Sequence, residues 1–193
     1  MNINKIEENI DIHISSFLKL KEEKELLKIF LNATNKVIET LKNNGKIFFA
    51  GNGGSAADSQ HASTELVVRF KKNRNSINAI ALGTNISTVT AISNDFGYEY
   101  IFSRELEGLG KKDDIVVGIS TSGNSPSIVN LLKKAKEIEC ITIGFTGQNG
   151  GKIDQYCDYL IRCPSTDVAR IQEIHGFLLH LFCEIIEEKL CND

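Results

Sequence analysis

The most constraining feature of this sequence is a short apolar run that ends in a polar, glycine-containing loop and continues as a helical pattern. Residues 46–50 lead into Gly51-Asn-Gly-Gly-Ser55 and a helical segment up to about Phe70, and residues 115–119 lead into Ser120-Thr-Ser-Gly-Asn-Ser125. Further strands are predicted at residues 77–82, 140–145 and 159–162, and helices at residues 86–93, 99–109, 126–138 and 168–190. This alternation predicts an α/β fold with a doubly wound parallel sheet of about five strands, flanked by helices.

The N-terminal part of the chain has a different pattern. Up to about residue 44, apolar side chains recur at helical intervals between charged ones, which predicts two amphipathic helices. About 45 residues bury little surface on their own. We therefore expect one domain over residues 1–193, in which a helical element (1–45) is used for packing or oligomerisation and residues 46–193 form the α/β core.

Charge and cysteine content exclude several classes of protein. A net charge of −3 and a pI near 5.9 argue against a protein whose main task is to coat nucleic acid. The start of the chain lacks the basic and apolar regions of a secretory signal, and its apolar stretches are too short for a membrane span. Five cysteines without CxxC spacing predict reduced thiols. We expect a cytoplasmic protein without nucleic-acid or membrane partners.

The first loop formally fits a dinucleotide fingerprint, with Gly51, Gly53 and Ala56 at the required spacing. That fingerprint also needs an acidic residue for the ribose, but residues 66–94 contain no Asp or Glu. Lys71 and Arg74 are basic and can bind a ribose 2′-phosphate, so NADP stays a remote alternative. No loop ends in Gly-Lys-Ser/Thr, which argues against ATP hydrolysis. We expect no nucleotide cofactor.

The second loop, residues 120–125, combines hydroxyl groups with the N-terminus of a predicted helix. Free N–H groups and the positive end of the helix dipole favour an anion there. The loop contains no lysine, which suits a monophosphate held by hydrogen bonds. The alternative is a cluster of N-capping residues without a ligand.

Two helices carry candidate catalytic groups. His61 and Glu65 lie four residues apart and so share one helical face, as a base with a possible metal ligand or simply as a salt link. On the last helix, Gln172, His175 and His180 lie on or near one stripe among apolar residues. A core histidine with one backbone partner is the alternative for His180, and we expect that role for His175.

Three blocks together identify a family. They are residues 51–61 running on to Glu65, residues 120–125, and Ala169-Arg-Ile-Gln-Glu-Ile-His175 running on to His180. The chain resembles the sugar isomerase (SIS) domain family from end to end, and in particular its heptose-phosphate isomerising members. The resemblance implies conversion of the ketose sedoheptulose 7-phosphate to D-glycero-D-manno-heptose 7-phosphate through an enediol, the first step toward activated heptoses for lipopolysaccharide core or capsule.

The resemblance also implies roles for individual residues. Glu65 would be the base and His180 its acid/base partner. Zinc would be held by His61, Glu65, Gln172 and His180. The substrate contacts would be Asn52, Gly53, Gly54, Ser55, Glu65, Asn94, Asp95, Ser120, Thr121, Ser122, Ser125 and Gln172. Glutamine is a poor zinc ligand, so we expect partial occupancy.

Gln172 and His180 are eight residues apart, about 12 Å along a helix, which strains joint ligation by one straight helix. The family typically forms homotetramers, so we expect a neighbouring subunit to complete the site. Some members carry an acidic residue where this chain has Ala169. Asp167 is close by, but the resemblance does not assign it the role of that acidic residue.

Two rival classes share the fold. A tetrameric binding module that associates with the replication initiator lacks the catalytic Glu and second His, whereas Glu65 and His180 are both present here. A sugar-phosphate-sensing regulatory domain usually accompanies a DNA-binding domain, for which no residues remain. Residues 71–74, Lys-Lys-Asn-Arg, are interpreted as a solvated loop, with phosphate steering as a lesser possibility.

Overall fold

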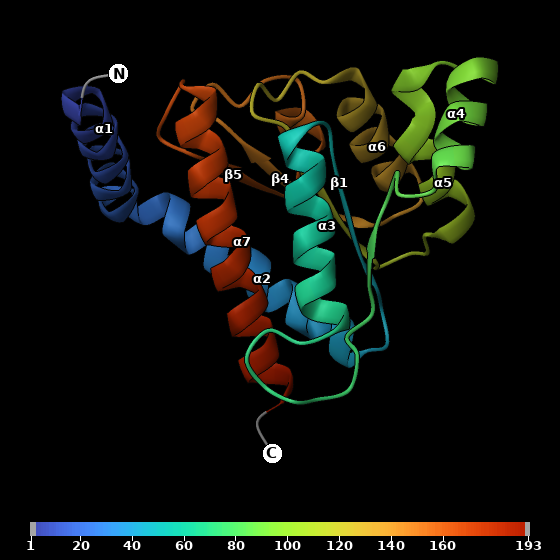
Figure 1. Cartoon of the computed structure of the whole chain (residues 1–193). Helices are drawn as coiled ribbons and strands as arrows, with labels where there is room; N and C mark the ends of the chain where they lie inside the picture. The colour runs from blue at the N-terminus through green and yellow to red at the C-terminus, as the bar shows by residue number, and fades with distance from the viewer. Residues whose placement is uncertain (1–2, 192–193) are drawn as a thin grey trace.

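The computed structural model describes residues 3–191, and a five-stranded parallel sheet forms the centre of this part of the chain (Figure 1). The strand order is β2-β1-β3-β4-β5, and every neighbouring pair is parallel. This arrangement confirms the predicted doubly wound class. The strands are β1 (Ile47–Gly51), β2 (Ala79–Ala81), β3 (Ile115–Ile119), β4 (Ile141–Thr146) and β5 (Tyr159–Arg162).

Helices cover both faces of the sheet. One face packs against α2, α3 and α7, and the other against α4, α5 and α6. The helices are α1 (Ile3–Glu22), α2 (Lys24–Lys42), α3 (Gly54–Val67), α4 (Ile86–Asp95), α5 (Ile101–Leu109), α6 (Pro126–Glu137) and α7 (Val168–Leu190), with short 3-10 turns η1 (Tyr98–Tyr100) and η2 (Asp154–Tyr156).

Alternation along the central strands divides the core into two hydrophobic clusters. In β1, Phe49 points into the cluster under α2, α3 and α7, whereas Phe48 points into the cluster under α5 and α6. Both rings are fully buried, and so are all five residues of β3. Strands that are buried on both faces read as continuous apolar runs, which is why the sequence reveals them.

Most predicted elements agree with the structure, and the differences lie at their ends. Helix α3 stops at Val67 rather than near Phe70, and β2 is limited to three residues. The helix expected over residues 99–109 is divided into η1 and α5. The predicted and observed boundaries of β3, β5 and α7 coincide.

Helix α1 stands at the side of the molecule and leaves much of its surface uncovered (Figure 1). It meets the start of α7, where Arg170 donates to the carbonyl of Asn9 and His13 pairs with Glu173 at 2.7 Å. Several of its apolar side chains are exposed: Ile3, Ile6, Ile10, Ile12, Ile14 and Leu18.

All five cysteines are free thiols, as the sequence predicted. Burial raises the pKa of four of them to about 12, which keeps these thiols protonated: Cys140, Cys157, Cys163 and Cys183. Among residues 3–191, no helix combines the length and the apolar character needed to cross a membrane.

Candidate active site

The sheet topology places two polar loops side by side. Its strand order reverses direction between β1 and β3, and the loops that follow these two strands are residues 52–53 and 120–125. In doubly wound sheets, ligands bind outside the carboxyl ends of the strands at such a switch point. The topology therefore brings together the two loops that the sequence singled out.

Asn52 connects the first loop to its surroundings. Its amide Nδ2 donates to Ser127 Oγ at 2.9 Å, and its Oδ1 accepts from the hydroxyl of Tyr98 at 2.8 Å. The following Gly53 has a φ of +57°, which favours glycine. Asn52 thus links the first loop to the start of α6 and to the segment after α4.

The second loop is closely packed and rich in hydroxyl groups. The Oγ of the buried Ser120 donates to Ser125 Oγ at 3.1 Å. Ser125 is the N-cap of α6, but its side chain makes no capping hydrogen bond. At Gly123 (φ +64°) a Cβ would approach the carbonyl oxygen of Gly150 to 1.7 Å, so no side chain fits. Hydroxyls and a helix N-terminus meet here, as an anion cradle requires.

The remaining predicted substrate contacts lie in the second loop, in the first turn of α3 and at the end of α4. Thr121 accepts a hydrogen bond from the backbone N–H of Gly147 at 3.0 Å, and Ser122 Oγ accepts one from that of Asn124 at 3.1 Å. Ser55 is buried in the first turn of α3. At the end of α4, Asn94 donates to Asp95 at 2.8 Å, and both side chains are exposed.

Helices α3 and α7 lie side by side and run in the same direction (Figure 1). At the top of the pair, a Cβ on Gly54 would lie 2.4 Å from the Nε2 of Gln172, so only glycine lets this amide approach α3. Further down, Cys183 Sγ donates to the carbonyl of Ala62 at 3.7 Å. The parallel packing brings groups at equal depth on the two helices together.

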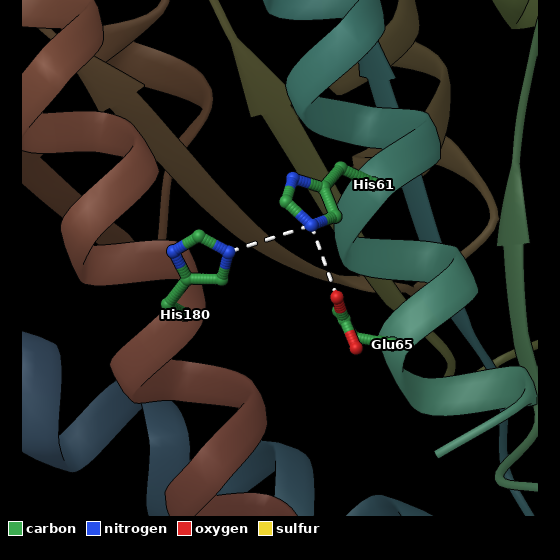
Figure 2. Close-up of side chains that lie close together, drawn as sticks. All are labelled: His61, Glu65 and His180. Atoms are coloured by element: carbon green, nitrogen blue, oxygen red, sulfur yellow. Dashed lines mark hydrogen bonds and ion pairs between the residues drawn. The ribbon is translucent and has the colours of Figure 1, made fainter. Parts of the chain in front are cut away.

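His61, Glu65 and His180 meet on this pair of helices (Figure 2). His61 Nε2 lies 3.0 Å from Glu65 Oε1 and 3.4 Å from His180 Nε2. The two imidazoles are edge to face, with centroids 4.7 Å apart. The side chain of Glu65 is 22% exposed and that of His61 is 53% exposed. His180 is also exposed, so the alternative of a core histidine is wrong for it.

The geometry of this cluster fits a divalent metal ion. One ligand atom from each of His61, Glu65 and His180 can be chosen so that all three lie within 4.8 Å of one another. Tetrahedral zinc with bonds of about 2.0–2.1 Å places its ligands roughly 3.3 Å apart, close to the two separations of 3.0 and 3.4 Å. Two imidazoles and a carboxylate are also donors that zinc accepts.

Gln172 is not beside this cluster. Its amide packs against Gly54, whereas His180 lies eight residues further along α7. That spacing corresponds to about 12 Å of helix rise. A single chain thus brings together three of the four predicted metal ligands and places the fourth at the first loop.

Asp58 faces the same cluster, and the sequence argument missed it. It lines a small cavity of about 10 Å³ together with His61, Glu65 and His180, and its Oδ2 is buried without a hydrogen bond to any described residue. Burial raises the pKa of this carboxyl, while the nearby His61 and His180 lower it. The signal was present, because Asp58 precedes His61 by three residues and Glu65 by seven on one helical face.

Three other sequence interpretations are settled by the contacts. His175 is a core histidine whose Nε2 lies 3.4 Å from the carbonyl of Thr146, as expected. Asp167 is the N-cap of α7 and accepts from the N–H groups of Ala169 and Arg170. The interpretation of residues 71–74 as a solvated loop is wrong for Arg74, whose side chain is 5% exposed.

Arg74 is buried, and a carboxylate and three carbonyls hold its guanidinium. It pairs with Glu187 at 3.0 Å and donates to the carbonyl oxygens of Glu65, Leu66 and Asn75. A cation held in this way has no free edge for a ribose 2′-phosphate. The contacts argue against the NADP alternative.

The fold and its two loops define an α/β domain of the SIS type, and the model of the SIS domain matches residues 14–147. A phosphoheptose isomerase of Campylobacter jejuni is 46% identical over 171 residues, which cover 88% of this chain and 92% of that protein. A phosphoheptose isomerase structure from Francisella tularensis superposes with a TM-score of 0.93 at 32% identity, covering 97% of this chain and 100% of the other. The structure of the enzyme from Neisseria gonorrhoeae gives a TM-score of 0.88 at 37% identity, covering 96% and 98%. The chain belongs to the phosphoheptose isomerase family of SIS-domain proteins.

Proposed function

We propose that this protein is an aldose–ketose isomerase that converts sedoheptulose 7-phosphate to D-glycero-D-manno-heptose 7-phosphate, a step toward activated heptoses for lipopolysaccharide core or capsule. Its family membership supports the reaction. The observation that carries the proposal is the meeting of Glu65 and His180 through His61 on two neighbouring helices. A carboxylate and an imidazole are the side chains best suited to move protons near neutral pH.

In the proposed reaction, Glu65 removes a proton from C1 of the opened ketose while His180 donates one to the oxygen on C2. The electron pair of the broken C–H bond forms the double bond of a cis-enediol. The proton on Glu65 exchanges with solvent, Glu65 then protonates C2, and His180 takes the proton from the oxygen on C1. The aldose results without net gain or loss of protons, and both groups return to their starting states.

Zinc is the proposed metal, held by His61, Glu65 and His180, with Gln172 as a further ligand. When bound, a zinc ion supplies polarisation of the carbonyl and stabilisation of negative charge on the enediolate oxygens. The separations of 3.0 and 3.4 Å within the cluster support this assignment. Because glutamine is a weak zinc ligand, partial occupancy is expected. Because Gln172 lies eight residues from His180 on α7, we propose that a neighbouring subunit supplies this fourth ligand.

The phosphate is proposed to bind at Ser120, Thr121, Ser122 and Ser125. Asn52, Gly53, Gly54, Ser55, Asn94, Asp95 and Gln172 would contact the sugar. The hydroxyl groups and the helix N-terminus of the second loop support its role.

A distance argument favours a site shared between subunits. Glu65 lies eleven residues beyond Gly54, about 16 Å along α3 from the loops. This rise is longer than an extended seven-carbon chain, and it supports a site in which a neighbouring subunit supplies either the second loop or Glu65. We infer such a shared site.

We propose a homotetramer in which α1 takes part in the contacts between subunits. The exposed apolar side chains of α1 support this role, because monomeric proteins rarely leave such a stripe in water. We also propose a cytoplasmic location, in keeping with free thiols and a metabolic substrate. Association with a replication initiator is not favoured, because Glu65 and His180 are both present.

The deciding experiment incubates purified, metal-defined protein with sedoheptulose 7-phosphate in D₂O and follows the aldose phosphate by NMR. The expected result is the heptose product with solvent deuterium at C2. A folded tetramer that forms no product under any metal condition would overturn the proposed function.

Glu65→Gln is the matched variant for the role of Glu65, because it keeps the shape of the side chain and removes the base. We expect the rate to fall by about 10²-fold or more while the fold is retained. Glu184→Gln on α7 is the control, since Glu184 pairs with Lys71 and lies outside the cluster. Retained activity in Glu65→Gln would assign the base to another residue.

A further inference from the structure

Glu187 is a buried carboxylate near the end of α7 that has no part in the proposed chemistry. It is 1% exposed and accepts four hydrogen bonds. Three come from the backbone N–H groups of Phe70, Lys71 and Lys72, at 2.9, 2.7 and 2.9 Å, and the fourth from Arg74 Nε at 3.0 Å. Burial alone would raise the pKa of Glu187, but these donors outweigh it and the pKa is lowered. The carboxylate therefore stays charged and holds the connection that follows α3.

The first branch of this network reaches Glu65. Arg74, paired with Glu187, donates from Nη2 to the carbonyl of Glu65 at 2.8 Å and from Nη1 to that of Leu66 at 2.7 Å. Both carbonyls lie in the last turn of α3, which ends at Val67 and lacks helical partners for its final carbonyl groups. Arg74 thus fixes the backbone that carries the Glu65 side chain.

The second branch reaches His180. The ring of Phe70, whose N–H binds Glu187, stacks on the imidazole of His180 with centroids 5.8 Å apart and an interplanar angle of 25°. His61 contacts the same imidazole edge to face. The two aromatic contacts together limit the orientations in which His180 can present Nε2 to His61.

We propose that Glu187 is a positioning residue for the cluster of His61, Glu65 and His180, acting on Glu65 through Arg74 and on His180 through Phe70. It touches neither metal nor substrate. The second loop, which would bind phosphate, lies at the opposite end of α3, so a change at Glu187 should affect the cluster and leave phosphate binding unaltered. The kinetic part of the inference rests on the proposed function, whereas the metal-binding part does not.

The test compares zinc affinity, kcat and KM in the wild type, Glu187→Gln and Glu184→Gln, with affinity measured by competition against a chromogenic chelator. A neutral amide oxygen cannot accept all four hydrogen bonds, so Glu187→Gln should bind zinc about 10-fold or more weakly. Its kcat should fall by a similar factor with KM within about twofold. Glu184→Gln lies one turn earlier on α7 and should match the wild type.

Phe70→Leu tests the second branch without disturbing a buried charge, and it decides the matter if Glu187→Gln does not fold. We expect weaker zinc binding and a lower kcat with KM unchanged. Zinc affinity and kcat within twofold of wild type in a folded Glu187→Gln would overturn the proposal. If Glu187→Gln is unfolded, wild-type values in Phe70→Leu would do so instead.

The outcomes also separate this proposal from the proposed function. Weaker zinc binding by the variants in a protein that does not isomerise the heptose phosphate would support the positioning role and refute the isomerase. If the wild type binds no zinc, the changes in kcat and KM decide. A wild type with neither zinc binding nor activity would overturn the proposal, because no site would be left to position.

Discussion

The Nε2 atoms of His61 and His180 lie 3.4 Å apart, although 119 residues separate them in the sequence. His61 Nε2 also faces Glu65 Oε1 at 3.0 Å, and the single proton that an imidazole can carry on Nε2 points along only one of these two contacts. A cation bound among the three side chains satisfies both contacts and also neutralises Glu65. The arrangement is better suited to a shared metal ion or proton than to an isolated pair of histidines.

The first prediction is that zinc stabilises the folded protein. A ligand that binds only the folded state at 100 times its dissociation constant adds about 2.7 kcal/mol to the free energy of unfolding. The midpoint temperature of thermal unfolding of the metal-free protein should therefore rise when zinc is added. His180→Ala should remove the shift, whereas His13→Ala, whose histidine pairs with Glu173 on the surface, should retain it. Equal shifts in the wild type and His180→Ala would place the metal elsewhere.

The second prediction concerns the anion cradle. Ser120 is buried and its Oγ donates to Ser125 Oγ, so Ser120→Ala removes one hydroxyl and frees another. A hydrogen bond to a charged group contributes about 1.5–3 kcal/mol, so KM should rise by roughly 10-fold or more with a smaller change in kcat. Steady-state kinetics with sedoheptulose 7-phosphate provide the measurement. Ser76→Ala, in an exposed position before β2, is the control. An unchanged KM in Ser120→Ala would show that the second loop does not bind the phosphate.

The third prediction is that α1 joins subunits. Ile10 is 51% exposed on a helix with little cover, and a charge there would be buried in any contact between subunits. Ile10→Glu should therefore sediment as a smaller species than the wild type. Its activity should fall with the loss of the assembly, because the proposed site is shared between neighbouring subunits. A fully active monomer would contradict the shared site.

The strand–loop–helix pattern was enough to predict the sheet and the position of the two loops. Apolar runs define β1 and β3, and Pro126 and Asp167 mark the starts of α6 and α7 through their suitability for a first turn and an N-cap. The approach of His180 to His61 was implied by a family resemblance and not by spacing, because it depends on how α3 and α7 pack.

The end of α3 shows why the rest was not predictable. Val68 and Phe70 continue the apolar pattern of the helix, so the sequence predicted helix up to about residue 70. In the structure, the N–H of Phe70 donates to Glu187, which lies 117 positions further along the sequence, and the helix ends at Val67. The same contact explains Arg74, which looked like part of a solvated basic run and instead pairs with Glu187. Local pattern carries no information about a partner so distant in the sequence.

The last prediction is a loss of stability between neutral and acidic pH that depends on His175. Burial lowers the pKa of this fully buried imidazole to about 4, and the contact with the carbonyl of Thr146 offsets burial only in part. In the unfolded chain its pKa is near 6.5. Between these values the unfolded state binds more protons than the folded state, so stability falls as pH decreases.

This difference in pKa between the folded and unfolded states lowers the free energy of unfolding by about 3 kcal/mol between pH 7 and pH 4. Urea unfolding at several pH values should show this decline in the wild type, in addition to any contribution from carboxylates. His175→Gln removes the titrating group, so its stability should depend less steeply on pH even though its value at pH 7 is lower. If His175→Gln and the wild type show the same slope, the imidazole is either not excluded from water or already charged in the folded protein.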